Sequence, residues 1–192
     1  MFRALLDTCV LVPSLQRDFL LQLAAEGCYS PLWGTGILFE LSYVLPRIDA
    51  ARGTAGGEER AARLLAQMES AFPGATVHAP KAHYPYALND PDDSHVAHAA
   101  IFGKADAVVT DDRRAGLATN QALQDANVEV LRSSDFVANT VAAHPLQARN
   151  ALTVMSRRFA NPRMSEIQVL ETLRDRYSLT EAFDLLAAEF YS

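Results

Sequence analysis

A three-residue apolar segment at residues 107–109 (Ala-Val-Val) constrains the fold of this sequence more than any other feature. It follows a stretch whose apolar residues, between 96 and 101, have the spacing of one buried helical face, and Gly103 ends that helix. Because the segment is too short for a helix, we predict a buried strand. Residues 110–112 (Thr-Asp-Asp) come where this strand would end. Open α/β sheets bind ligands at the carboxyl ends of their strands, so this position is a candidate site.

A short strand followed by a helix recurs through the first 131 residues. We predict strands at residues 3–7, 28–33, 75–79, 107–109 and 128–131. We predict helices at residues 14–26, 37–45, 58–72, 96–101 and 117–126, and a Gly- and Ala-rich loop at 49–57. This alternation indicates an α/β fold, a mostly parallel sheet with helices on both faces.

The pattern changes after Ser133, where helical spacing continues without any strand-like segment. We predict helices at residues 135–143, 146–159, 165–177 and 180–190. Ser165 and Thr180 are the predicted N-caps of the last two. We therefore predict two parts, an α/β domain at residues 1–140 and an α-helical C-terminal extension at residues 141–192.

Composition is typical of a soluble globular protein. The chain has 192 residues, 49% of them hydrophobic, and can bury a sizeable core. No apolar run reaches membrane-spanning length, and no long apolar segment precedes Asp7 as a signal peptide requires. We expect a cytoplasmic protein. The net charge of −6 does not favour a protein that coats nucleic acid, but it is compatible with an enzyme that gathers carboxylates around a metal ion.

Acidic residues occur at four separate places in the pattern of strands and helices. They follow the first strand, lie within the helix at 37–45, begin the helix at 96–101 and follow the strand at 107–109: Asp7; Glu40; Asp90, Asp92 and Asp93; Asp111 and Asp112. Carboxylates packed together without a counterion have raised pKa values and destabilise the fold. Oxygen ligands favour Mg²⁺ or Mn²⁺, which can activate water and stabilise a leaving oxygen in phosphodiester hydrolysis. The acids therefore indicate a metal-dependent nuclease or phosphatase.

Four segments of the sequence resemble the motifs of PIN-domain ribonucleases, in particular the VapC-like toxins of type II toxin–antitoxin pairs. In chain order they are L-L-D-T-C-V-L, F-E-L-S-Y-V-L, D-P-D-D-S-H-V-A-H-A-A and A-D-A-V-V-T-D-D. The resemblance covers residues 1 to about 135, and the helical tail resembles the C-terminal extension of one VapC subgroup. It implies a PIN-like fold and a Mg²⁺- or Mn²⁺-dependent endoribonuclease. It further implies a toxin that cuts tRNA or rRNA, a small cognate antitoxin and a homodimer.

The resemblance also implies roles for individual residues. Asp7, Glu40, Asp93 and Asp112 match the four acidic positions that bind the metal and support catalysis. Thr8 and Thr110 match the hydroxyl positions that hold the acids in place.

Some of these assignments have competitors within the sequence. Helical spacing favours Asp93 over Asp92, because Asp93, Val96 and Ala97 share a face. The family's Thr-x-Asp pattern favours Asp112 over Asp111, and this choice stays open. Asp90 is either a supporting residue or simply the turn residue before Pro91.

Five further residues in or near the motifs have less specific roles. Cys9 stands where the family often has Ser or Asn, so we expect weaker support for Asp7. His95 and His98 flank the apolar face of their helix. A general-base role is the alternative, but we expect packing or surface roles for both, because metal-bound water already supplies the nucleophile. Arg113 and Arg114 follow Asp112 and are predicted to contact substrate phosphates, with a solvated surface as the equal alternative for Arg113.

Two other functional classes remain to be weighed. The first is a receiver-like or phosphatase domain on a similar sheet. A receiver needs a Lys after a late strand, but Lys81 and Lys104 do not follow one, and an aspartyl phosphatase needs Asp-x-Asp where this chain has Asp7-Thr8-Cys9. The second is a catalytically silent PIN-fold module that binds RNA or protein. The presence of all four acids argues against it.

Overall fold

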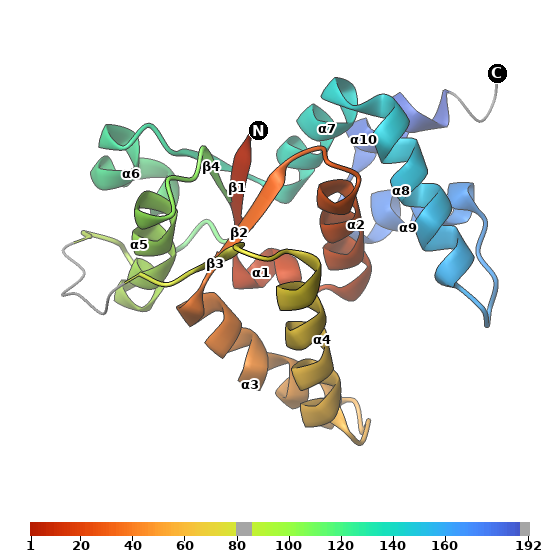
Figure 1. The fold of residues 1–192 in the computed structure, drawn as a ribbon, viewed down its shortest axis with the longest axis horizontal. Coiled ribbons are helices and arrows are strands. Elements are labelled where there is room, and N and C mark those ends of the chain that lie inside the picture. Colours follow the sequence, from red (N-terminus) through yellow and green to blue (C-terminus); the bar gives the residue numbers. More distant parts are fainter. Residues whose placement is uncertain (80–85, 189–192) are drawn as a thin grey trace. The chain divides into compact units, whose positions relative to one another are not determined.

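The computed structural model describes residues 1–79 and 86–188 (Figure 1). Lys81 and Phe190, the predicted end of the last helix, lie outside the described residues. Within residues 1–79 and 86–188, no helix combines the length and the apolar character that crossing a membrane requires.

The chain contains a five-stranded sheet, and Asp7 and Thr110 directly follow two of its strands. Its order is β3-β2-β1-β4-β5, and the pairs β1–β4, β4–β5 and β2–β3 are parallel. The strands are β1 (Arg3–Leu6), β2 (Ser30–Gly34), β3 (Thr76–Val77), β4 (Ala107–Val109) and β5 (Glu129–Leu131). This arrangement confirms the predicted α/β class, with helices flanking a parallel sheet.

The register of β1 against β4 decides what meets at the edge of the sheet. Both strands are fully buried over three residues each, which explains their continuous apolar sequences. Leu6 pairs with Val109. The next residue of each strand, Asp7 and Thr110, therefore emerges at the same edge, side by side.

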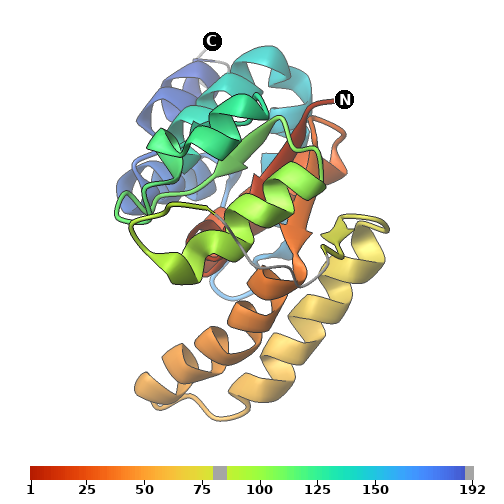
Figure 2. The same cartoon turned by 90° about the vertical axis from the view of Figure 1, so that its left-hand side faces the viewer.

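The first compact unit comprises residues 1–12 and 31–131. Its helices are α1 (Thr8–Leu11), α3 (Thr35–Ala51), α4 (Gly57–Ala71), η1 (Pro91–Asp93), α5 (Ser94–Phe102), η2 (Leu117–Thr119) and α6 (Gln121–Asp125). Helices α3 and α4 run side by side as a hairpin, and α5 lies over one face of the sheet (Figure 2).

Two local predictions within this unit are wrong, and one short helix was not predicted. Helix α3 continues past Pro46 to Ala51, so the predicted loop at 49–57 shrinks; Asp49 on α3 accepts two hydrogen bonds from the Arg60 guanidinium on α4. The predicted helix at 117–126 is broken at Asn120, whose side chain caps α6 by accepting from the Leu123 amide. The short helix α1 directly after Asp7 was not predicted.

The second compact unit comprises residues 13–30 and 132–192. Its helices are α2 (Ser14–Ala25), α7 (Ser133–Ala143), α8 (Pro145–Arg158), α9 (Glu166–Tyr177) and α10 (Thr180–Ala187). Helix α2 packs against α8 and α9, far along the chain, and buries Phe19, Leu20 and Leu23 completely. The predicted boundary at residue 140, between an α/β domain and a helical extension, stays a prediction.

The two predicted helix caps of the second unit had different outcomes. Ser165 caps α9 in a capping box with Gln168, which confirms the prediction. The N-cap of α10 is Leu179 and not Thr180, and it makes no side-chain capping bond. Leu179 is 1% exposed, so burial of its side chain accounts for this start of the helix.

A close contact between Gly34 and Ala99 brings α5 against the junction of β2 and α3. A Cβ atom on Gly34 would lie 2.7 Å from the Ala99 Cβ. This approach matters for the site because α3 carries Glu40 and the start of α5 follows Asp93.

We predict that Gly34→Ala destabilises the chain by about 1–3 kcal/mol, the usual effect of overpacking. Urea denaturation followed by circular dichroism measures this change. Ala99→Gly removes the atom that the new methyl group meets, so the double variant should be less destabilised than the sum of the two single variants. Strict additivity would show that the contact is not the cause.

Candidate active site

Asp7, at the carboxyl end of β1, is the most buried of the predicted site acids, with 6% of its surface exposed. Its Oδ1 accepts a hydrogen bond from the Thr8 amide at 2.7 Å, which also caps α1. Its Oδ2 accepts from the Thr110 hydroxyl at 2.7 Å. Buried carboxylates require such donors because desolvation strongly disfavours an unpaired charge. The β1–β4 register therefore orients this carboxylate.

Glu40 comes from the second turn of α3 and reaches the same region. Its Oε2 accepts a hydrogen bond from the Thr8 hydroxyl. Thr8 thus contacts two predicted acids, Asp7 through its amide and Glu40 through its side chain. The His95 ring also approaches Oε2, with Nε2 at 3.7 Å. The sequence did not indicate this proximity of His95, because 55 residues separate it from Glu40.

Asp93 ends η1 directly before α5, and its environment raises the pKa of its carboxyl from 3.8 to about 6. Burial is the largest cause. The negative charges of Asp7, Asp90, Asp112 and Glu40 follow in that order. These four acids come from separate segments of the chain.

Asp112 and Thr110 are connected by a turn after β4. The Asp112 amide donates to the Thr110 hydroxyl oxygen at 3.1 Å, and the Asp112 Oδ1 accepts from the Arg114 amide at 2.6 Å. The charge of Asp112 acts on Asp93. The Asp111 amide instead donates to the Cys9 sulfur at 3.2 Å.

Asp90 combines the two roles that the sequence left open. Its Oδ1 accepts a hydrogen bond from the Asp92 amide at 3.0 Å, which is the turn-forming role. Its charge is also the second largest electrostatic contribution to the raised pKa of Asp93.

Cys9 takes a more central position than the sequence indicated. Its sulfur lies 3.2 Å from the Asp7 Oδ2 and 3.3 Å from the Thr110 hydroxyl. Burial, followed by the charge of Asp7, raises the pKa of the thiol to about 12. The thiol therefore stays protonated at neutral pH and donates to Asp7. Cys9 adds a donor where we expected weaker support.

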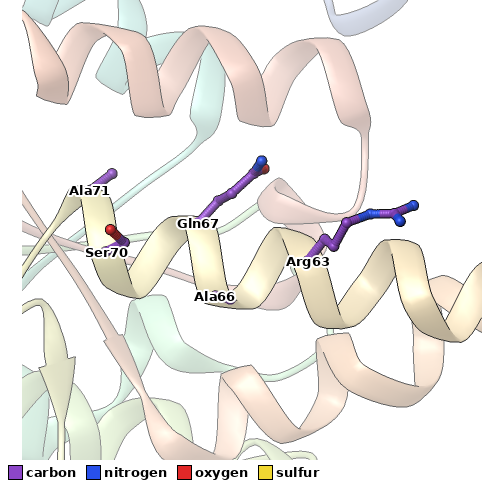
Figure 3. Close-up of a pocket in the computed structure, with 5 residues that line it drawn as sticks. All are labelled: Arg63, Ala66, Gln67, Ser70 and Ala71. Carbon is purple, nitrogen blue, oxygen red and sulfur yellow. The ribbon is translucent and has the colours of Figure 1, made fainter.

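The predicted substrate-binding residues directly follow Asp112, and the Arg114 amide contacts the Asp112 carboxylate. Arg113 and Arg114 are both exposed beside Asp112. The hollow along α4 is no alternative site: it is lined by Arg63, Ala66, Gln67, Ser70 and Ala71, all from one helix, and contains no carboxylate (Figure 3).

The acids suit a hard divalent cation by their chemistry. All four predicted ligands offer oxygen atoms, and the raised pKa of Asp93 reflects a repulsion that a cation would relieve. Within residues 1–79 and 86–188, however, no three His, Cys, Asp or Glu side chains already stand in positions to hold an ion together. The donor set fits the metal, and binding would require these side chains to move closer.

Comparison with known proteins gives one match. A family model described as the PIN domain matches residues 3–114, which include all the predicted acids. Searches of curated proteins and of solved structures gave no match.

We predict that Thr110→Val destabilises the chain by about 1–3 kcal/mol, because it removes a donor to Asp7 and an acceptor for the Asp112 amide inside the fold. Thr110→Ser keeps the hydroxyl and should recover most of this loss. Chemical denaturation of both variants in EDTA tests the prediction. A Thr110→Val variant as stable as wild type would contradict the prediction.

We predict that Asp93→Asn stabilises the metal-free chain at pH 7 by about 1 kcal/mol, after allowance for solvent screening. The folded state binds a proton to Asp93 more tightly than the unfolded state does. As the pH falls through 6 towards 4, wild type gains stability relative to the variant, and the difference should close.

Thermal unfolding in EDTA between pH 4 and pH 7 measures this difference, expected near 2–4 °C at pH 7. Asp92→Asn, one residue earlier and exposed, is the matched control. An Asp93→Asn variant no more stable than wild type at pH 7 would contradict the origin of the shift.

Proposed function

Given that the chain belongs to the PIN-domain family, whose members are generally nucleases, we propose that it is a Mg²⁺- or Mn²⁺-dependent endoribonuclease. The observation that carries this proposal is a set of hydrogen bonds that join acids from separate segments: Thr8 contacts Asp7 and Glu40, and Thr110 contacts Asp7 and the Asp112 amide. The raised pKa of Asp93 agrees with this arrangement. Carboxylates from separate segments that share one region are what a divalent metal site for phosphodiester hydrolysis needs.

Asp7, Glu40, Asp93 and Asp112 are the proposed metal ligands and catalytic residues. A bound divalent cation would activate water and neutralise negative charge on the leaving oxygen. The protein's part is positioning. Thr8 and Thr110 hold the Asp7 carboxylate by hydrogen bonds, and Thr8 also contacts Glu40.

Substrate binding is assigned to the surface next to Asp112. Arg113 and Arg114 are exposed there, and guanidinium groups bind phosphate oxygens in pairs. These contacts would position an RNA backbone without reading its bases.

The biological role in the proposal follows from the motifs. We assign the chain to the VapC-like toxins, acting in the cytoplasm on tRNA or rRNA as a homodimer and restrained by a cognate antitoxin. In this proposal, residues 1–140 form the PIN-like nuclease domain and residues 141–192 form a helical C-terminal extension.

A second candidate is a PIN-fold module that binds RNA or protein without cleaving it. One observation favours it: within the described part of the chain, no three potential ligands are already positioned to hold an ion. Metal binding and cleavage assays separate the two candidates.

We predict that the purified chain cleaves tRNA or rRNA in Mn²⁺ or Mg²⁺ and not in EDTA. Asp7→Asn should lower the cleavage rate about 100-fold or more, because loss of a ligand should exceed the 10–100-fold effect of losing an outer-shell partner. Gel analysis of end-labelled RNA measures both. Asp125→Asn changes an exposed acid on α6 and should retain the wild-type rate.

Asp112→Asn and Asp111→Asn form a matched pair that identifies the ligand after β4. We expect the Asp112 variant to lose activity and the Asp111 variant to retain most of it, because the Asp112 charge acts on Asp93. The opposite result would reassign the ligand. A folded wild-type chain that binds Mn²⁺ but cuts neither RNA class would favour the binding module.

A further inference from the structure

Helix α3 leaves two neighbouring aromatic side chains exposed. Phe39 is 70% exposed and Tyr43 is 41% exposed. Their ring centroids lie 5.5 Å apart at an interplanar angle of 64°, which is an edge-to-face pair. Single exposed apolar side chains are common on protein surfaces, whereas neighbouring ones indicate a surface that makes contact with another molecule.

The aromatic pair adjoins Glu40, one of the proposed metal ligands. Glu40 and Tyr43 are three residues apart on α3, so their side chains leave the helix at neighbouring positions. Glu40 in turn contacts the Thr8 hydroxyl at the edge of the sheet. A chain molecule bound at the proposed active site can therefore reach the aromatic pair.

The same face of α3 continues from the aromatic pair to a cation. Arg47 follows Tyr43 by four residues, as Tyr43 follows Phe39, so the three side chains share one helical face. Arg47 is exposed, and within residues 1–79 and 86–188 its guanidinium takes part in no ion pair. Aromatic rings beside an unpaired guanidinium match the two parts of a nucleotide, its base and its phosphate.

The size of the aromatic pair favours a nucleotide over a protein as its occupant. A stable protein–protein interface buries about 800 Å² of each partner and involves roughly 20–30 residues a side. A single base needs only one ring face. An edge-to-face pair has no slot between parallel rings, so the more exposed ring, Phe39, offers the stacking face and Tyr43 supports it from the side.

We propose that Phe39 stacks on an unpaired RNA base close to the cleavage site, while Arg47 binds a phosphate of the same strand. The contact is tolerant of sequence, because every base has an aromatic face. The inference rests on the proposed function, because RNA bound at the acids is what brings a base within reach of α3.

Binding of an end-labelled single-stranded RNA of about 12 nucleotides tests the stacking contact. Fluorescence anisotropy measures the affinity in EDTA, where metal-dependent cleavage does not run, and again in Ca²⁺, which neutralises the acids. Phe39→Ala should weaken binding about tenfold, the effect of losing one stacked base. Phe39→Leu keeps an apolar side chain without a ring and should lose nearly as much, whereas Phe39→Trp should stay within about threefold of wild type.

Three controls separate base stacking from other effects. Double-stranded RNA of the same length keeps its bases inside the duplex, so Phe39→Ala should bind it as wild type does. Phe102→Ala removes another exposed phenylalanine, at the end of α5, and should leave the affinity unchanged. Arg47→Ala should lower the slope of log affinity against log salt by about 0.7, a change that Phe39→Ala should not cause.

A second variant on the same pair guards against failure of the first to fold. Tyr43→Ala removes the side support of the Phe39 ring and should weaken binding of single-stranded RNA about threefold. Circular dichroism verifies that each variant folds.

The outcomes are distinguishable. Wild-type affinity for single-stranded RNA in Phe39→Ala overturns the inference, and a smaller assembly of that variant in ultracentrifugation would then identify the pair as a contact between copies of the chain. A Phe39→Leu variant that binds like wild type also overturns it, because an apolar contact without stacking would then suffice.

Failure of the inference is separate from failure of the proposed function. A wild-type chain that cuts no RNA but binds it through the Phe39 ring contradicts the nuclease proposal and leaves the stacking contact standing. A folded wild-type chain that binds no single-stranded RNA in either buffer overturns both.

Discussion

The hydrogen bonds that hold Asp7 are the interactions on which the rest of the site depends. A carboxylate that is 94% buried is tolerated only where donors replace water. The Thr8 amide, the Thr110 hydroxyl and the Cys9 thiol supply them. Thr110 reaches Asp7 because the parallel strands β1 and β4 end in register. The register of the sheet therefore also determines which donors stabilise the charge of Asp7.

The acids around Asp7 oppose the stability of the fold. Their charges, added to burial, hold the pKa of Asp93 near 6, which means that folding works against its ionisation at neutral pH. A cluster of this kind does not stabilise the fold, because neutral side chains in the same positions would repel one another less. It is consistent with a site kept for binding a cation, where function is retained at the expense of stability.

Local chemistry explains which parts of the fold could be predicted. The capping box at Ser165 and Gln168 involves residues three apart, and the apolar segment of β4 is buried on both faces, so both features can be recognised in the sequence. The start of α10 depends on burial of Leu179 by other helices, and α3 continues past Pro46 beside α4. These outcomes depend on packing partners distant in the chain.

The sequence by itself determined the α/β class and the acids at the ends of the strands, because these follow from local periodicity and residue type; the PIN motifs came from the resemblance of four segments to a known family. Only the tertiary structure decided that Cys9 donates to Asp7, that His95 faces Glu40 and that α2 packs with the C-terminal helices. The physical reason is that strand register and helix packing join residues whose separation along the chain carries no local pattern. A site assembled from several segments becomes defined only when those segments meet.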